Sequence, residues 1–316
     1  MAADGTYALE ADDLAKRYGA HEAVRGIGLA IPRGEFFGLL GPNGAGKTTT
    51  LGMLAGLIEP SRGRIRIAGR PAERRSAELK RKLGLVPQEF AFYPTLSAKD
   101  NLAFFGEIFG LSGARLRERI ATVLDIARLE GRDREPVAQF SGGMKRRLNI
   151  AIGLLHEPEI LILDEPTVGV DAQSRAAILD ALQQLNRAGI TILYSTHTLE
   201  EAERLCSRVA IMDQGRIVAE GAPRELVRGL AQGIVEVEFA DPPGDELAAR
   251  LQSLATVMRL EEGGRVIHLE APTPEELLPM LFEAARSSGQ AIRNLRLLEP
   301  GLEAVFLKLT GHHLRD

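Results

Sequence analysis

The chain has 316 residues, of which 45% are hydrophobic and 26% charged, ordinary values for a protein that buries a core. This length predicts one large domain with a smaller one, or two domains. The formal net charge of −4 gives no bulk attraction to nucleic acid, so we expect no nucleic-acid partner. The single cysteine, Cys206, excludes an internal disulfide and is expected to be a packing residue. Neither a signal-peptide pattern nor a run of about 18 apolar residues occurs, so we expect any membrane role to come through a partner.

The first elements expected along the chain are two antiparallel strands, Leu9–Ala15 and Glu22–Ile31, separated by a turn at Tyr18-Gly19. Aromatic residues make up only 5% of the chain, so Tyr18 in this polar turn is notable. A flat ring there either stacks on the adenine of a nucleotide or is an ordinary surface tyrosine. Position alone leaves both interpretations open.

The segment after the short apolar strand Glu35–Leu40 fits the P-loop pattern G-x-x-x-x-G-K-[ST], and its residues are Gly41, Pro42, Asn43, Gly44, Ala45, Gly46, Lys47 and Thr48. A helix from Thr48 to Ala55 is expected next, so the strand–loop–helix context that the motif requires is present. The backbone N–H groups of such a loop and helix start hold phosphate oxygens. We expect Lys47 to reach the β- and γ-phosphates and the Thr48 hydroxyl to ligate Mg²⁺. This stretch predicts a nucleotide site.

The middle of the chain carries two further polar motifs. The buried strand Leu83–Val86 leads to Gln88, which would orient a water or contact Mg²⁺; capping of the loop is the alternative. A basic tract, Arg70–Lys82, is expected to be a solvated helical face rather than a binding patch. Residues 97–155 show apolar residues at helical spacing, which predicts a helical insert. Its last helix begins with Ser141, Gly142 and Gly143, which predict either a second anion-binding helix start or an ordinary serine cap.

A second buried strand, Ile160–Leu163, ends in two carboxylates, Asp164 and Glu165. Beside a phosphate site, Asp164 would hold Mg²⁺ and Glu165 would polarise the attacking water. The next strand, Thr191–Ser195, leads to His197, and its place after the Asp164 strand directs this histidine to the γ-phosphate. The candidate catalytic residues are therefore Lys47, Gln88, Glu165 and His197, and the candidate metal ligands are Thr48, Gln88 and Asp164.

The pattern changes after Gly229, which predicts a first domain of residues 1–229 and a second of residues 230–316. Strands and helices of the second domain are expected in the order β-α-β-β-α-β, followed by a last helix, Gly301–Leu309. No catalytic constellation is recognisable there, and His312 and His313 are expected to be tail residues rather than metal ligands. The predicted fold class is α/β: a P-loop nucleoside-triphosphatase core with an antiparallel β-subdomain and a helical insert, plus a small α+β domain at the C-terminus.

Taken together, these motifs resemble the ATP-binding subunit of ABC transporters over roughly Leu9–Gly229. Gly41–Thr49 is similar to the Walker A loop of that family, Ile160–Glu165 to its Walker B strand, and Gly169–Asp171 to its D-loop. In Ser141-Gly142-Gly143 the chain resembles the family signature, although Met144 stands where the commonest form has glutamine. The last helix is similar, more weakly, to the C-terminal extension of drug-exporter ATPases of the daunorubicin-resistance type.

This resemblance implies a role for each matched residue. Thr49 would bind nucleotide with the rest of the Walker A loop, and Tyr18 would stack on adenine. Gln88 would be the Q-loop glutamine and His197 the switch histidine. Ser141, Gly142 and Gly143 would cover the nucleotide held by the Walker A loop of a second subunit, because the family pairs its subunits head to tail.

The implied function is that of a Mg²⁺-dependent ATPase that drives a separate integral-membrane permease, with an exporter favoured. The implied partners are this permease and a second copy of the chain or a paralogous ATPase subunit. The expected location is cytoplasmic, on the inner face of the cell membrane. A soluble ABC-type ATPase is the principal alternative, but the single P-loop and the lack of sustained heptads argue against a translation factor and a DNA-repair protein respectively. A nucleotide switch without hydrolysis is disfavoured by Glu165.

Overall fold

The computed structural model describes residues 6–72, 77–229, 233–254, 257–260, 264–271, 274–298 and 301–311. These form two compact units, one ending at Ile217 and the other beginning at Val218. The division falls inside β10 (Arg216–Gly221), upstream of the predicted boundary at Gly229. It lies there because α8 (Pro223–Arg228) packs on α11 (Leu302–Thr310), a helix of the second unit.

A six-stranded sheet forms the centre of the first unit, with strand order β10-β9-β3-β8-β7-β6. Its remaining strands are β3 (Phe36–Leu40), β6 (Leu83–Val86), β7 (Ile160–Asp164), β8 (Thr191–Thr196) and β9 (Arg208–Asp213). The pairs β3–β8, β3–β9, β6–β7 and β7–β8 are parallel. Every residue of β3, β7 and β8 is buried, which explains why these strands are continuous apolar runs rather than alternating ones.

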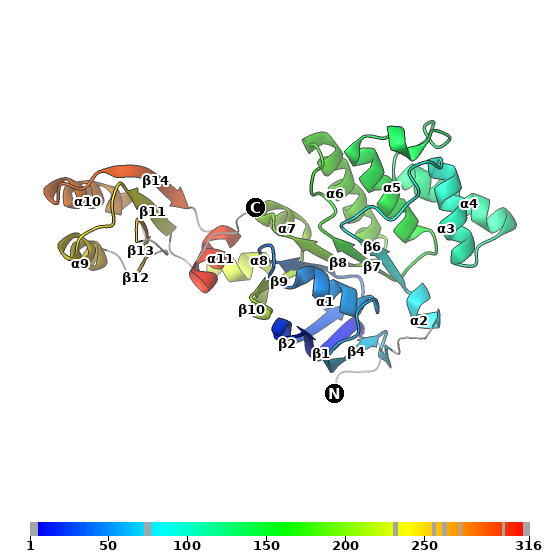
Figure 1. Cartoon of the computed structure of the whole chain (residues 1–316), viewed down its shortest axis with the longest axis horizontal. Coiled ribbons are helices and arrows are strands. Elements are labelled where there is room, and N and C mark those ends of the chain that lie inside the picture. The colour runs from blue at the N-terminus through cyan, green and yellow to red at the C-terminus, as the bar shows by residue number, and fades with distance from the viewer. Residues whose placement is uncertain are drawn as a thin grey trace. The chain divides into compact units, whose positions relative to one another are not determined.

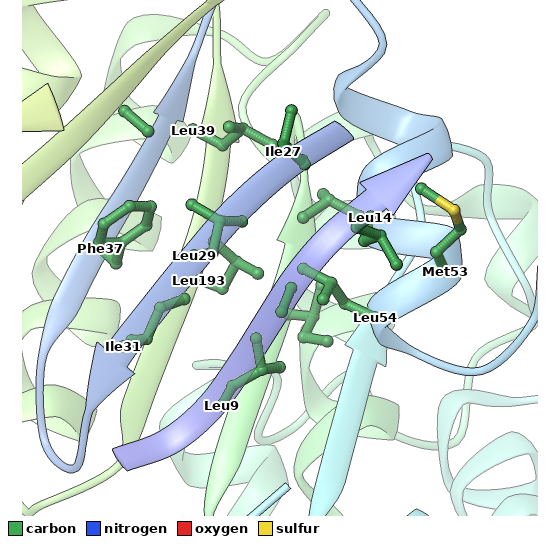
Figure 2. Close-up of a cluster of buried hydrophobic side chains, with 14 of the residues drawn as sticks. Leu9, Leu14, Ile27, Leu29, Ile31, Phe37, Leu39, Met53, Leu54 and Leu193 are labelled. Atoms are coloured by element: carbon green, nitrogen blue, oxygen red, sulfur yellow. The ribbon is translucent and has the colours of Figure 1, made fainter. Parts of the chain in front are cut away.

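An antiparallel sheet of order β2-β1-β4-β5 packs beside this core. Its strands are β1 (Tyr7–Tyr18), β2 (His21–Pro32), β4 (Arg62–Ile67) and β5 (Arg70–Pro71). Figure 2 shows side chains of β1 and β2, such as Leu14 and Leu29, gathered with Leu39 of β3, Leu54 of α1 and Leu193 of β8. This shared apolar cluster holds the P-loop helix between the two sheets.

The helices of the first unit are α1 (Lys47–Leu54), α2 (Ala77–Arg81), α3 (Ala98–Ile108), α4 (Gly113–Ile126), α5 (Gly142–Leu154), α6 (Ala172–Arg187) and α7 (Leu199–Leu205), with a 3₁₀ turn at Val137–Gln139. Figure 1 shows α3, α4 and α5 grouped together, away from β1, β2 and β4. These three helices and the 3₁₀ turn lie within the predicted helical insert, and the whole arrangement confirms the predicted α/β class. Of the predicted basic tract, residues 73–76 lie outside the described residues.

The second unit contains an antiparallel sheet of order β12-β13-β11-β14. Its elements are β11 (Gly233–Phe239), α9 (Asp245–Leu254), β12 (Val257–Leu260), β13 (Val266–Ala271), α10 (Pro274–Ser287), β14 (Ile292–Leu298) and α11. The predicted β-α-β-β-α-β order is confirmed. One buried cluster joins the sheet to α9 and α10, and a smaller one joins Ile234 to Ala304 and Leu307 of α11. His312 and His313 lie outside the described residues. Across the described ranges, none of the helices combines the length and the apolar character that a bilayer span requires.

Candidate active site

The P-loop turns tightly between β3 and the start of α1. Gly46 caps the helix with φ +104°, and a Cβ there would lie 2.5 Å from the carbonyl oxygen of Ala23 in β2. A Cβ on Gly41 would lie 2.2 Å from the carbonyl oxygen of Met212 in β9. The close approaches at both positions, and the positive φ at Gly46, favour glycine over a residue with a side chain. The close packing at these two glycines fixes the path of the loop against β2 and β9.

The other predicted P-loop residues differ in exposure. Asn43, Gly44 and Thr48 are exposed, Pro42 and Thr49 are half-buried, and Ala45 and Lys47 are buried. The backbone N–H groups at the start of α1 lack partners within the helix, as at any helix start. Together with the open backbone at Gly44, where φ is +83°, this arrangement fits the binding of phosphate oxygens.

Lys47 is the buried cation of the site. Its Nζ donates hydrogen bonds to the carbonyl oxygens of Gly41 at 2.7 Å and Pro42 at 3.1 Å. It also forms an ion pair of 3.0 Å with Oε1 of Glu165, whose side chain is 6% exposed. A cation held between loop carbonyls and the carboxylate at the end of β7 lies where phosphate charge would be neutralised.

Glu165 is shared between Lys47 and His197. Nδ1 of His197 lies 3.3 Å from Oε2 of Glu165, whereas the lysine pairs with Oε1. Burial raises the pKa of the Glu165 carboxyl, but the hydrogen bond and charge of Lys47, joined by His197, lower the pKa more, so the net shift is downward. The backbone of Glu165 has φ +45°, a sparsely populated conformation for a residue with a side chain. The structure thus brings together three of the four predicted catalytic residues.

Asp164 occupies the last position of β7 and is 4% exposed. Ser195 of β8 donates its hydroxyl hydrogen bond to Oδ1 of Asp164 at 2.7 Å and accepts one from the N–H of Glu165 at 3.0 Å. Carboxylate and hydroxyl oxygens are ligands that Mg²⁺ prefers, so Asp164 and Thr48 fit this ion. The described residues contain no cluster of three or more His, Cys, Asp or Glu suited to a metal. A Mg²⁺ here would depend on phosphate oxygens and water as well as protein.

Gln88 and Tyr18 are two further predicted site residues with exposed side chains. The main chain of Gln88 is held from α5, because Arg146 donates to its carbonyl oxygen at 2.7 Å. Tyr18 ends β1 and is 49% exposed, with Nζ of Lys16 lying 5.1 Å from its ring centroid. An exposed ring a few residues before Ala23, which adjoins the P-loop, is open to stacking.

The signature residues contact a different part of the first unit. Ser141 caps α5, its hydroxyl accepting a hydrogen bond from the N–H of Met144 at 3.2 Å. Gly143 packs on Ser174 at the start of α6, and Gly142 faces Gly169. Ser141 and Gly142 are exposed. The contacts of these residues are thus to α5 itself and to residues 169–174 rather than to the P-loop.

Two residues that hold the site together were not predicted from the sequence. Ser195, which joins Asp164 to Glu165, is one of several small polar residues at the end of β8. Glu201 of α7 is a buried carboxylate that accepts hydrogen bonds from Thr167, Tyr194 and Thr196. The sequence held no signal for it, because Glu200 and Glu201 are adjacent and only the fold distinguishes them.

The strand–loop–helix, the buried lysine and the two carboxylates at the end of β7 define a P-loop nucleoside triphosphatase. The ABC transporter family matches residues 24–168 of the chain. A linearmycin resistance ATP-binding protein, LnrL of Bacillus subtilis (strain 168), is 41% identical over 98% of this chain and 100% of its own length. The chain belongs to the ABC transporter family, as an ATP-binding subunit with ATPase activity.

Other known proteins agree with this assignment. A Nod factor export ATP-binding protein I of Cupriavidus metallidurans (strain CH34) is 42% identical over 98% of this chain and 100% of its own length. Among solved structures, a dimeric ATP-binding cassette in a post-hydrolysis state bound to ADP and Pi is 28% identical, with a TM-score of 0.62. That match covers 68% of this chain and 98% of the other.

Proposed function

We propose that this ATPase dimerises around two Mg·ATP and drives export through a separate integral-membrane permease. The observation that carries the proposal is the joining of Lys47, Glu165 and His197 in one site while Ser141, Gly142 and Gly143 are exposed elsewhere or packed on α6. One chain then supplies half of a complete site. The solved post-hydrolysis cassette is dimeric, which supports pairing of this chain with a second copy or a paralogous subunit.

The chemistry proposed for the site follows from its charges. Lys47 exchanges the loop carbonyls for β- and γ-phosphate oxygens. Glu165, kept ionised by Lys47 and His197, orients and polarises the attacking water, and His197 adds a donor at the γ-phosphate. Thr48, Asp164 and Gln88 would hold a Mg²⁺ ion, which would supply positive charge to neutralise the phosphate oxygens. Tyr18 stacks on adenine.

An exposed aromatic patch supports docking of a membrane partner. We define this patch by five residues, all more than a third exposed: Phe90, Tyr93, Leu96, Phe104 and Ile108. Tyr93 and Phe104 meet edge to face at 5.0 Å, and buried Asn101 fixes the loop by hydrogen bonds to both the N–H and the carbonyl oxygen of Tyr93. Exposed apolar residues gathered in this way are typical of an interaction site. It follows Gln88, so motion of that loop with nucleotide would reach the permease.

Export is the direction favoured by the relatives, one named for Nod factor export and the other for linearmycin resistance. The chain would then act at the cytoplasmic face of the membrane, attached through the permease. The permease would select the cargo, because no described residue of the ATPase site distinguishes one cargo from another.

The shared site is tested with mixed dimers. Lys47→Ala removes the phosphate cation, and Ser141→Arg places a bulky side chain at the signature. In a Glu165→Gln background, which should trap closed dimers, a heterodimer of the two variants concentrates both lesions in one site and leaves the other intact. We expect this heterodimer to occlude one ATP and either variant homodimer to occlude none. Heterodimers that occlude no ATP, or Ser141→Arg homodimers that occlude it normally, would contradict the proposal.

A further inference from the structure

Glu201, on α7, carries a carboxylate that is buried next to the site without belonging to it. The residue is 3% exposed. Three hydroxyl groups donate to the same oxygen, Oε2: Tyr194 at 2.6 Å, Thr167 at 3.0 Å and Thr196 at 3.0 Å. Each donor is itself buried. Hydrogen bonds to an ionised oxygen are shorter and stronger than neutral ones, so this oxygen ties three chain segments together.

Packing alone does not account for this carboxylate. Its other oxygen, Oε1, makes no hydrogen bond within the described part of the chain, and its ion pair with Nε of Arg175 spans 3.9 Å. The Arg175 side chain is half exposed, so it compensates the buried charge incompletely. An apolar side chain would fill such a place at a lower desolvation cost. The reason for a carboxylate here is therefore to be found in the chain segments that carry the three hydroxyl groups.

Two of the three hydroxyls lie beside the residues assigned to hydrolysis. Thr167 is two residues beyond Glu165, in the turn that carries the strained φ of +45°. Thr196 immediately precedes His197, and its carbonyl oxygen accepts a hydrogen bond from the N–H of Gly41 in the P-loop at 3.3 Å. Glu201 thus contacts both turns that place Glu165 and His197. The third donor, Tyr194, lies inside β8, adjacent in the chain to neither Glu165 nor His197, and its hydroxyl is 3.4 Å from that of Thr167.

We propose that Glu201 is a positioning residue for ATP hydrolysis, fixing the turn after Glu165 through Thr167 and the approach of His197 through Thr196. The inference rests on the roles of Glu165 and His197 proposed above. A residue with positive φ keeps that conformation only where its surroundings hold it, and the bond from Thr167 to Glu201 supplies such a restraint. Because a displacement of about 1 Å can cost about 10²-fold in rate, loosening either turn lowers turnover without removing a group that binds ATP.

The test removes one hydroxyl at a time. Thr167→Val and Thr196→Val keep the side-chain shape and lose the bond to Glu201, while Thr196→Ser keeps the hydroxyl. Thr196→Val also loses the hydrogen bond from the N–H of Thr198, which the double-variant cycle below separates from the link to Glu201. Tyr194→Phe is the matched control, because it also deletes one bond to the same oxygen. We expect each valine variant to lower kcat about 10-fold or more, with the Kd for ATP within about twofold of wild type. Thr196→Ser should keep kcat near that of wild type. Tyr194→Phe should keep kcat within about threefold of wild type, even if its Tm falls as much as the Tm of the valine variants.

A double-variant cycle tests whether Thr196 acts through Glu201. Glu201→Ala and Thr196→Val should each lower kcat, and the combined variant should be no slower than the worse single variant, since they interrupt the same link. Multiplied effects would overturn the inference, as would a loss of kcat in Tyr194→Phe equal to that of the valine variants. Should Glu201→Ala fail to fold, the hydroxyl variants still decide. Glu165→Gln is measured alongside. If this variant hydrolyses ATP at the wild-type rate, the role assigned to Glu165 is wrong. If it is slow while the hydroxyl and Glu201 variants are not, only the role proposed for Glu201 is wrong.

Discussion

The Glu165 carboxylate has a cation on one side and an imidazole on the other, so it stays ionised and can accept a proton from water. Glu165→Gln keeps the shape of the side chain and removes this basicity. We expect ATP binding to be retained and hydrolysis to fall by about 10² or more, the scale of losing a positioned base. ATP affinity and turnover are measured on the same preparation. Near-normal turnover would remove Glu165 from the mechanism.

The same residue gives the nucleotide-free protein an acid-sensitive part of its stability. Because Lys47 and His197 hold the pKa of Glu165 below its ordinary value of 4.5, the ionised carboxylate stabilises the fold fully above that value. The contribution is lost as pH falls through the lower, folded-state pKa. We expect the difference in urea midpoint between wild type and Glu165→Gln to be constant from pH 6 to pH 7 and to narrow below pH about 4.5. A difference in urea midpoint that widens in acid would show that the pKa of Glu165 is raised rather than lowered in the folded state.

Tyr18 tests the assignment of the base-binding face. Its ring is 49% exposed, and stacking of a base on an aromatic ring is worth about 1–3 kcal/mol, so Tyr18→Ala should weaken ATP binding by that amount. Tyr93, 48% exposed in the aromatic patch, is the matched control, and Tyr93→Ala should leave the affinity unchanged. Calorimetric titration of both variants decides. Equal affinities would make Tyr18 a surface tyrosine of the β1–β2 turn.

The P-loop motif predicted Lys47, and the ends of two buried strands predicted Glu165 and His197; the structure places Glu165 in contact with both of the others. The sequence could not single out Glu201. One of its donors lies in the turn that follows β7 and the other two lie in β8. The periodicity of apolar residues shows which face of an element a residue occupies, but not which residues of other elements it contacts. Nor could it show that Lys47 and Glu165 pair directly, since that depends on side-chain geometry.

At the scale of elements, the pattern of apolar residues predicted the strands and helices, but not which strands pair with each other in the sheet. The strand Thr191–Ser195 was predicted from its apolar run, whereas its place between β3 and β7 follows from long-range pairing that a single sequence does not encode. That place brings Thr196 beside Gly41 and Ser195 beside Asp164. The β1–β2 pair is also longer than predicted, because bulges let both strands extend past their polar residues.

The start of α5 offers a test of packing between helices. A Cβ on Gly143 would lie 2.2 Å from Oγ and 2.4 Å from Cβ of Ser174, whereas one on Gly142 would be no closer than 3.6 Å to the carbonyl oxygen of Gly169. Gly143→Ala should therefore destabilise the fold by about 1–3 kcal/mol, the usual cost of overpacking. Gly142→Ala, with the same gain in helix preference, should stay within about 1 kcal/mol of wild type. Urea unfolding of both variants measures this; equal stabilities would mean that α5 and α6 separate easily.

At the scale of the whole molecule, the two units differ in their candidate functional residues. All the candidate site residues, from Tyr18 to His197, lie in the first unit. The second unit has its own sheet and its own apolar core. Its sheet has the strand order β12-β13-β11-β14. The sequence predicted a second domain from the change of pattern after Gly229, whereas the second compact unit begins at Val218. The division at Ile217 was not predictable, because it depends on the contact of α8 with α11.

Removing the second unit's sheet tests this separation of roles. Deletion from Gly233 onward takes away β11 to α11 and leaves every candidate ATP ligand in place. We expect the shortened chain to be soluble and to bind ATP with a Kd within about threefold of the full chain, a change of about 0.6 kcal/mol. Subunit pairing or its regulation is where we expect the tail to act, so ATP-dependent dimerisation is compared in the same preparations. Far-UV circular dichroism and cooperative unfolding establish that the shortened chain is folded, which matters because α8 loses its partner α11. A folded truncation that no longer binds ATP would show that the second unit contributes to the nucleotide site.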